Sequence, residues 1–297
     1  MKYAVTYTKN FRHYDEVDEV IFPYKGISDE EGLIEIVTNT LTREDQRAII
    51  LVDKYEQSID DLIPIVRKLK TVHENMTVSL NFDYQHEWIG KLKEAEIPFM
   101  FVNFATTVTQ IAAMAIFGAK DIYIAEDICF MIPKLQILRE MDGIRLRVFP
   151  DILQTPRRCA SLPQMTNFFI RPEDIDLYEK YIDVIEIFRK DSRQSVVYEI
   201  YRQGQWRGPL ADLIIDLEED ISGASFIPDF GKARLNCGRR CAMTDCDICT
   251  YSVEVGRQME EAGIAFVKQK KKREASEEIK KQAEEIMEKM EQADDNK

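Results

Sequence analysis

The sequence predicts a (β/α)₈ TIM-like barrel that carries a C-terminal extension with a Cys₄ metal site and a charged helical tail. The first observation is a series of eight short apolar runs within roughly 190 residues, separated by amphipathic or polar stretches. Most runs are solidly apolar, which is typical of strands buried on both faces of a parallel sheet. Because strands that alternate with helices form right-handed crossovers, the alternation predicts a parallel sheet. A barrel of this kind usually has about 250 residues, so this one is compact.

The expected strands are three to five residues long and lie at 20–22, 49–52, 78–80, 99–102, 122–125, 144–148, 168–170 and 184–187. Residues 5–7 are either an additional strand or part of the barrel bottom. Because the number of strands depends on such short runs, an open doubly wound sheet is the alternative architecture.

Two of the connecting stretches have the spacing of three and four residues that marks one face of a helix. The first face comprises Ile59, Leu62, Ile63, Val66 and Leu69. The second comprises Val108, Ile111, Ala112 and Ala115, and Gly118 follows as a natural C-cap.

The chain divides into a barrel over 1–205, an extension with the metal site over 206–265, and a charged tail over 266–297. The last thirty residues contain nine basic and nine acidic side chains and no Gly, Pro or aromatic residue. A thin apolar stripe runs along this predicted helix at Ile279, Ala283, Ile286 and Met290. The stripe allows either a short coiled coil with a protein partner or a solvated helix.

Composition excludes some classes of protein. The chain has 53 acidic and 40 basic side chains, a net charge of −13, which disfavours broad binding to nucleic acid. No stretch approaches the about 18 consecutive apolar residues of a membrane span. The first ten residues lack the pattern of a secretory signal, so we expect a cytoplasmic protein without a membrane partner.

Four of the six cysteines lie within thirteen residues, at Cys237, Cys241, Cys246 and Cys249. Thiolates are soft ligands, and four of them suit either an iron–sulfur cluster or a tetrahedral Zn²⁺ ion. Basic side chains close to them favour thiolate formation and balance the charge of a Cys₄ site. These basic side chains are Lys232, Arg234, Arg239 and Arg240. The two other cysteines, Cys129 and Cys159, are expected to be free thiols.

The spacing C-x3-C-x4-C-x2-C bears on the choice of metal. Its last three cysteines match the C-x4-C-x2-C spacing of plant-type 2Fe–2S ferredoxins, with the fourth cysteine close upstream instead of remote. Zinc ribbons usually present two C-x2-C pairs separated by a longer stretch. An iron–sulfur cluster is therefore the favoured cofactor, and Zn²⁺ is the alternative.

Several segments resemble the collagenase-like peptidase family. They are GAKDIYIAEDI at 118–128, IRLRVFPDI at 144–152, YIDVIEIFRKDSR at 181–193 and FIPDFGKARLNCGRRC at 226–241. The resemblance implies a barrel, and several members of the family carry a cysteine-bound 4Fe–4S cluster and serve hydroxylation of ubiquinone precursors or tRNA. The family collects its cluster ligands from separated positions, whereas the four cysteines here lie in one segment.

Ligand sites of parallel β/α folds lie at the carboxyl ends of the strands. Polar side chains at these positions are Asp53, Asn81, Asn103, Glu126, Asp127, Asp151, Arg171 and Arg189. Helix capping is the other explanation for Asp and Asn at such positions. We select Asn103, Glu126, Asp127 and Arg189 as the substrate-binding residues at the barrel mouth.

Two functions fit this sequence. The first is an iron–sulfur enzyme, a hydroxylase or oxidoreductase, that modifies a small or polar substrate at the barrel mouth. The second is a non-enzymatic binding or scaffold protein in which zinc holds the extension and the helical tail binds a protein partner.

Overall fold

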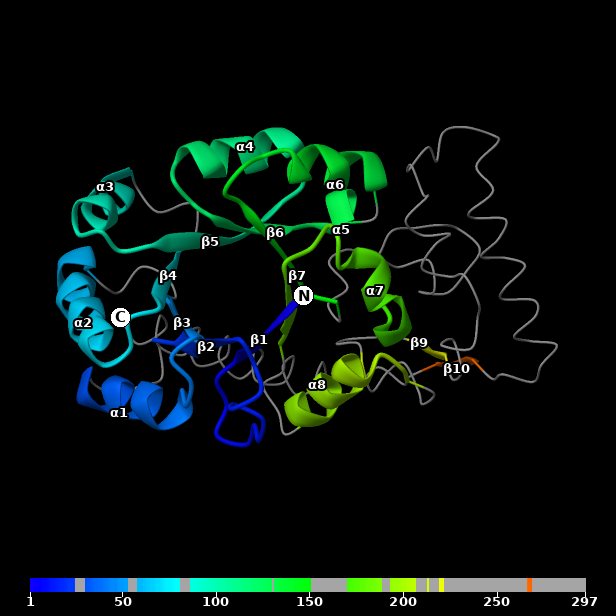
Figure 1. Cartoon of the computed structure of the whole chain (residues 1–297), viewed down its shortest axis with the longest axis horizontal. Coiled ribbons are helices and arrows are strands. Elements are labelled where there is room, and N and C mark those ends of the chain that lie inside the picture. Colours follow the sequence, from blue (N-terminus) through cyan, green and yellow to red (C-terminus); the bar gives the residue numbers. More distant parts are fainter. Residues whose placement is uncertain are drawn as a thin grey trace, which may run out of the picture.

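The computed structural model describes residues 1–24, 30–52, 58–80, 86–129, 131–150, 170–188, 193–206, 213, 219–221 and 266–268. Eight parallel strands form a closed barrel in the order β1 to β8, and Figure 1 shows the helices around it. The barrel closes where β1 pairs with β8, with Ala4 opposite Glu186. The predicted (β/α)₈ fold is confirmed, and the open sheet is excluded.

The strands of the barrel are short, as expected. They are β1 (Lys2–Thr6), β2 (Glu19–Pro23), β3 (Arg47–Leu51), β4 (Met76–Leu80), β5 (Phe99–Ala105), β6 (Asp121–Ile124), β7 (Arg145–Val148) and β8 (Val184–Ile187). Helical segments lie between most of them. They are α1 (Glu30–Thr40), α2 (Ile59–Val72), α3 (His86–Glu94), α4 (Val108–Ile116), α5 (Glu126–Cys129), α6 (Ile132–Arg139), a 3₁₀ turn (Pro172–Asp174), α7 (Ile175–Tyr178) and α8 (Gln194–Gln203).

One expected strand is wrong. Ile170, the described residue of the 168–170 run, is not in a strand, and its N–H donates to the carbonyl of Pro150 at 3.1 Å. The remaining strand of the barrel is β1, which overlaps residues 5–7. An apolar run of three residues does not distinguish a strand from a buried connection, and β1 was obscured by the polar residues on either side of its apolar centre.

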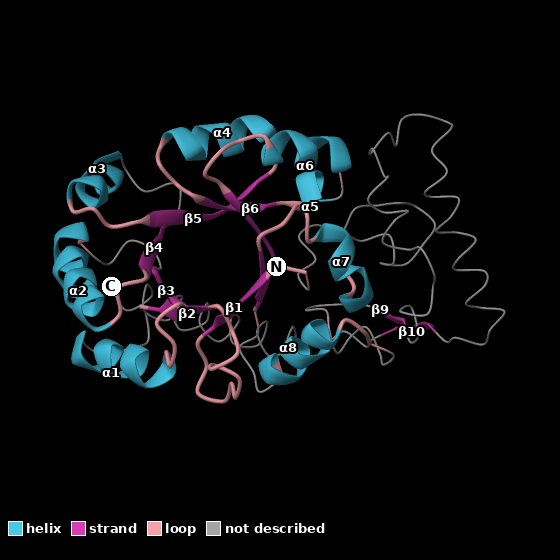
Figure 2. Ribbon diagram, in the orientation of Figure 1, coloured by secondary structure: helices cyan, strands magenta, loops and turns pink. Residues whose placement is uncertain are grey.

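The barrel has two separate apolar regions because side chains alternate across each strand. Val20, Phe22 and Ile50 pack outward against the helices in the larger core. Ile21, Ile49 and Met100 point inward, where they form a smaller cluster with Ala4, Tyr123 and Val184. Figure 2 shows the strands enclosed by the helices that cover the outer face.

The two predicted helices are confirmed as α2 and α4, and their buried faces include most but not all of the predicted residues, since Ile65 and Met114 are also buried while Ile63 is only partly buried. Ser58 caps α2 by accepting a hydrogen bond from the N–H of Asp60. Thr107 and Gln110 form a reciprocal capping box at the start of α4. Gly118 follows α4 with a φ of 99°, a backbone conformation that favours glycine.

Two short strands, β9 (Glu219–Ile221) and β10 (Phe266–Lys268), pair in antiparallel fashion, with Phe266 opposite Ile221. In Figure 1 this pair lies outside the ring of helices. The pairing joins the two ends of segment 222–265, which contains the four clustered cysteines. That segment and the predicted helical tail beyond Lys268 lie outside the described residues, and the division at 205 and 265 remains a prediction.

Candidate functional site

Three of the four predicted substrate-binding residues, Asn103, Glu126 and Asp127, are described, and they lie at the carboxyl end of the barrel. Asn103 lies near the end of β5 and is partly buried. Glu126 and Asp127 follow β6 and begin the one-turn helix α5. Arg189 and all four clustered cysteines lie outside the described residues. Whether these side chains form one site therefore remains a prediction.

Asn103 lies in an irregular part of β5. Phe101 pairs with Ile122 of β6, but the next pair joins Phe104 to Tyr123, so two additional residues of β5 are inserted between them. An insertion of two residues preserves the alternation of inward and outward side chains. As a result Phe104 takes the inward position opposite Tyr123.

Aromatic side chains form the floor of the barrel mouth. The rings of Tyr123 and Phe149 stack at 5.1 Å between centroids with an angle of 4° between their planes. The ring of Phe104 lies 5.5 Å from that of Phe149 and 5.8 Å from that of Tyr123, and the ring of Phe188 lies 6.3 Å from that of Phe149. We call Phe104, Tyr123, Phe149 and Phe188 the aromatic floor. It offers flat apolar surface to a molecule that enters from the carboxyl end.

A buried polar group lies directly next to the aromatic floor. The hydroxyl of Tyr123 donates to Oε2 of Glu186 at 2.5 Å, and Nη2 of Arg147 donates to the same oxygen at 3.0 Å. Burial raises the pKa of Glu186 even though Arg147 opposes that shift. Burial and the charge of Glu186 also raise the pKa of Tyr123 well above its usual value, so the phenol keeps its proton.

Another wall of the mouth is fixed where α8 begins. Gln194 is buried, and its side-chain amide donates to the carbonyl of Thr6 at 2.7 Å and to that of Ile187 at 3.5 Å. These carbonyls end β1 and β8, so Gln194 joins the two strands that close the barrel.

Arg171 is another of the polar residues that follow an expected strand. It is buried and forms an ion pair with Asp174, which explains its presence without a ligand.

The amino-terminal half of the interior is filled by charged side chains. We call this set the charge network, and it comprises Glu19, Arg47, Asp121, Arg145, Arg147 and Glu186. Four of its members are the first residues of β2, β3, β6 and β7. Three guanidinium groups meet three carboxylates, so the network is electrically balanced, as buried charges must be.

Glu19 lies at the centre of the charge network. It accepts hydrogen bonds from Arg145 and Arg147, and its Oε1 lies 3.7 Å from Nη1 of Arg47. Burial alone would raise the pKa of Glu19, but Arg147, Arg145 and Arg47 together lower it to about 2. Glu19 is therefore ionised at neutral pH.

Arg47 and Asp121 occupy the next positions of the network. Nη1 of Arg47 donates to Oδ2 of Asp121 at 2.8 Å, while its Nε and Nη2 donate to Oγ1 of Thr77 at 2.9 and 2.6 Å. Oδ1 of Asp121 lies 3.4 Å from Nη1 of Arg145 and has no hydrogen-bond partner.

The charge network was not predicted, because the predicted site contained only polar side chains at the carboxyl ends of strands. Its sequence signal is a charged residue at an inward position of an apolar strand, as in the alternation of Arg145 and Arg147 with Leu146 and Val148. Glu186 between Ile185 and Ile187 has the same signal. A charge in a strand that is buried on both faces requires a partner, which predicts an interior network without identifying its pairs.

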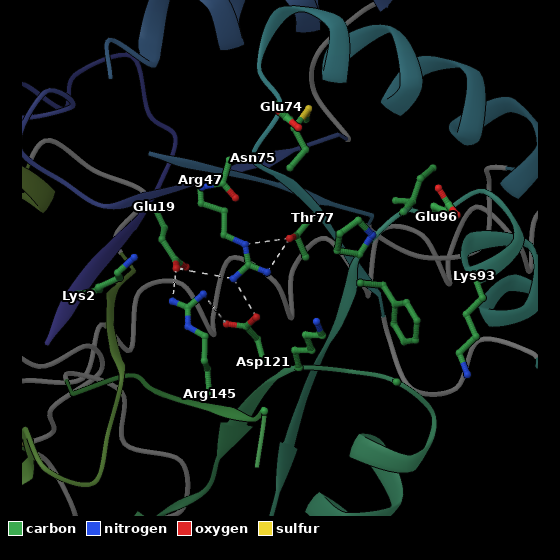
Figure 3. Close-up of a pocket in the computed structure, with 17 residues that line it drawn as sticks. Lys2, Glu19, Arg47, Glu74, Asn75, Thr77, Lys93, Glu96, Asp121 and Arg145 are labelled. Atoms are coloured by element: carbon green, nitrogen blue, oxygen red, sulfur yellow. Dashed lines mark hydrogen bonds and ion pairs between the residues drawn. The ribbon is translucent and has the colours of Figure 1, made fainter. Parts of the chain in front are cut away.

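A cavity of about 600 Å³ opens at the amino-terminal end of the barrel, opposite the mouth. Figure 3 shows Glu19, Arg47, Asp121 and Arg145 at its floor. Thr77 lies beside Arg47 there. The charge network thus connects this cavity with the polar group next to the aromatic floor.

Among the described residues, no group of three or more His, Cys, Asp or Glu side chains is placed to hold a metal ion. Cys129 is buried and forms no disulfide bond in the described part of the chain, in agreement with the prediction, and Cys159 lies outside the described residues. No helix of the described part of the chain is long and apolar enough to cross a membrane.

No family model and no curated protein sequence matches this chain. Similar solved structures include a type I 3-dehydroquinate dehydratase from Clostridium difficile, with 8% identity and a TM-score of 0.46, covering 68% of this chain and 90% of that one. A 3-keto-L-gulonate-6-phosphate decarboxylase from Vibrio cholerae has 10% identity and a TM-score of 0.42, covering 68% and 96%.

The U32 peptidase Mk0906 has 11% identity and a TM-score of 0.39, covering 64% of this chain and 93% of that one. The resemblance of the sequence to the collagenase-like peptidases therefore stays a prediction. The neighbours are enzymes of different kinds, and at these identities their activities are statements about those proteins alone. The barrel assignment of this chain rests on its own strand order.

Proposed function

We propose that this protein is an iron–sulfur barrel enzyme that carries out hydroxylation or another redox modification of a substrate bound at the carboxyl end of the barrel. One observation carries the proposal. Segment 222–265 contains four thiols in a stretch of thirteen residues. The two ends of this segment are held together by the pairing of β9 with β10. Because closing a long loop costs conformational entropy, a segment joined at its base is better prepared to gather four ligands.

The donor set fits the proposed group. Four thiolates with basic side chains nearby suit an iron–sulfur cluster, which would supply electron transfer when bound. Cys237, Cys241, Cys246 and Cys249 would hold it. The residues of the barrel would position the substrate.

The substrate that we propose has a polar part and a flat apolar part. Asn103, Glu126, Asp127 and Arg189 follow strands at the carboxyl end and would bind the polar part. The aromatic floor would contact the apolar part, because stacked and edge-on ring contacts favour planar groups. This refines the expectation of a polar substrate.

The test begins with anaerobic purification of the full chain, followed by its visible spectrum and its iron, sulfide and zinc content. The proposal predicts brown protein with absorbance in the blue-violet region and bound iron and sulfide. Cys→Ser substitution at any of the four clustered cysteines should remove the metal, whereas Cys129→Ser should not. Retention of metal when two clustered cysteines are replaced together would contradict the assignment.

The spectrum and the metal content also distinguish the proposed enzyme from the second function. Colourless protein with one zinc ion per chain would support the binding or scaffold protein, in which the metal holds the extension in place. At the mouth, Arg189→Met keeps the apolar stem and removes the guanidinium. If Arg189 binds substrate, this variant should fold normally and lose activity.

A further inference from the structure

The cavity at the amino-terminal end of the barrel is built entirely from described residues. Its wall consists of the first residues of several strands and the turns that precede them. It lies at the opposite end of the barrel from the mouth, and no proposed substrate-binding or metal-binding residue lines it. Its volume of about 600 Å³ is ample for a small molecule.

Arg145 presents unused hydrogen-bond donors to this cavity. A guanidinium has five N–H donors. Among the described residues, the guanidinium of Arg145 makes one hydrogen bond, to Glu19, and an ion pair with Asp121 at 3.4 Å, and its side chain is 30% exposed. Arg47 makes three hydrogen bonds and is only 12% exposed. Since Glu19 and Asp121 are each 1% exposed, the floor offers guanidinium donors to a ligand and conceals its carboxylates.

Lysines add positive charge at the rim. Lys2, Lys93 and Lys120 line the cavity and are exposed, and none of the described residues forms an ion pair with them. The stem of Lys93 lies close to Gly118, where a Cβ would be 3.0 Å from Cε of Lys93. The absence of a side chain lets the lysine stem lie across the glycine.

The cavity is locally basic in an acidic protein. Five basic and four acidic side chains line it, although the whole chain has a net charge of −13. Ile97, Pro98 and Phe99 lie together along the lining, so a carbon skeleton also finds apolar surface. A guanidinium with spare donors favours carboxylate and phosphate oxygens, which accept two parallel hydrogen bonds.

We infer that this cavity is a second binding site, for a small organic anion with a carboxylate or phosphate group, which Arg145 anchors and Lys93 and Lys120 attract. The site is independent of the cysteines and of the barrel mouth. Its function can therefore be tested whether or not the protein binds an iron–sulfur cluster.

The experiment is isothermal titration calorimetry of the full chain with succinate, glycerol 3-phosphate and inorganic phosphate. We expect saturable binding of an organic anion that weakens as the salt concentration rises. Succinate and glycerol 3-phosphate distinguish a carboxylate site from a phosphate site. Binding of inorganic phosphate alone, or of none of the three, would overturn the inference.

Variants locate the binding. Lys93→Met and Lys120→Met change exposed side chains, and together they should weaken binding about tenfold. Arg145→Lys keeps the charge but removes the fork, and it should weaken binding at least as much if thermal melting shows that it folds. The matched control is Lys9→Met, since Lys9 is exposed and follows β1 at the opposite end of the barrel. Binding that is unchanged in the two lysine variants, or that is lost equally in Lys9→Met, would disprove the site.

Discussion

The two halves of the barrel interior are filled by side chains of different chemistry. In the amino-terminal half, charged side chains such as Glu19, Arg47 and Arg145 fill the space and pair with one another. In the carboxyl-terminal half, aromatic rings such as Phe104 and Phe149 fill it. Tyr123 joins the halves, because its ring stacks on Phe149 while its hydroxyl binds Glu186.

This difference in side-chain chemistry determines what kind of ligand each end of the barrel can bind. In the charged half, three cations and three anions lie within reach of one another, and Arg145 is the most exposed of the three arginines at 30%, against 12% for Arg47 and 0% for Arg147. The aromatic half offers contact area but little polarity. Specific recognition of a polar ligand at that end would therefore need polar side chains in addition to the rings, and the residues proposed above for substrate binding are polar.

The largest effect is expected from Glu19→Gln, which breaks the charged half at its centre. Removal of this carboxylate leaves three guanidinium groups with two carboxylates, so one positive charge of a network that includes the fully buried Arg147 is uncompensated. Loss of one partner of a buried ion pair costs about 3–5 kcal/mol of the free energy of unfolding. Urea unfolding measures it. In the double variant Glu19→Gln/Arg147→Met the loss should be smaller than the sum of the single losses, and strict additivity would contradict the pairing.

The pH dependence of stability sharpens the same contrast. The pKa of Glu19 is lowered from 4.5 to about 2 in the folded protein. Its ionised form therefore stabilises the fold above pH 4.5, and this contribution, about 3 kcal/mol, is lost as the pH falls from about 4.5 to about 2. Burial raises the pKa of Glu186, so its protonation on acidification acts in the opposite direction.

The measurement is the urea midpoint of the natural protein and of Glu19→Gln between pH 2 and pH 7. The difference in stability between them should shrink as the pH falls through this window, because the carboxylate that distinguishes them becomes protonated. A difference that stays constant down to pH 2 would show that Glu19 is not held by the three arginines.

Tyr123→Phe tests the junction between the halves. The ring and its stacking on Phe149 remain, but the hydrogen bond to Glu186 is lost, which should cost about 2 kcal/mol because the acceptor is charged. Near-ultraviolet circular dichroism should show that the aromatic floor is intact. An unchanged free energy of unfolding would mean that Arg147 alone satisfies Glu186.

A matched pair on β4 gives the smallest effects. Thr77→Val removes the oxygen that accepts from Nε and Nη2 of Arg47 and should cost about 1–2 kcal/mol. Ser79→Ala removes a buried hydroxyl that has no hydrogen-bond partner, so its effect should stay within about 0.5 kcal/mol. Urea unfolding of the two variants compares a used hydroxyl with an unused one on the same strand. Equal losses would contradict the role of Thr77.

Much of the fold could be predicted because periodicity is a local property. Seven of the eight expected strands coincide with β2 to β8, and the faces of α2 and α4 followed from residue spacing. The exception was the 168–170 run, whose described residue, Ile170, is buried but is not in a strand. Only closure of the barrel identifies β1 as the remaining strand, because its partner β8 lies about 180 residues further along the chain.

The interior chemistry was harder to predict, for a physical reason. Glu19 and Arg147 are 128 residues apart in sequence, and their pairing depends on the relative positions of two strands that do not touch. The insertion in β5 that places Phe104 opposite Tyr123 has no distinct composition either. Side chains at strand ends could be selected from topology alone, but their mutual geometry depends on the connections that follow.

The charge network also restricts the register in which the strands can pair during folding. If β7 slipped by one residue, Arg145 and Arg147 would turn toward the apolar helices while Leu146 and Val148 would face the carboxylates. A slip by two residues would keep the faces but move each guanidinium away from its partner. Apolar side chains of similar size tolerate such errors, whereas unpaired buried charges do not. The interior ion pairs thus give this small barrel a single alignment in which it can close.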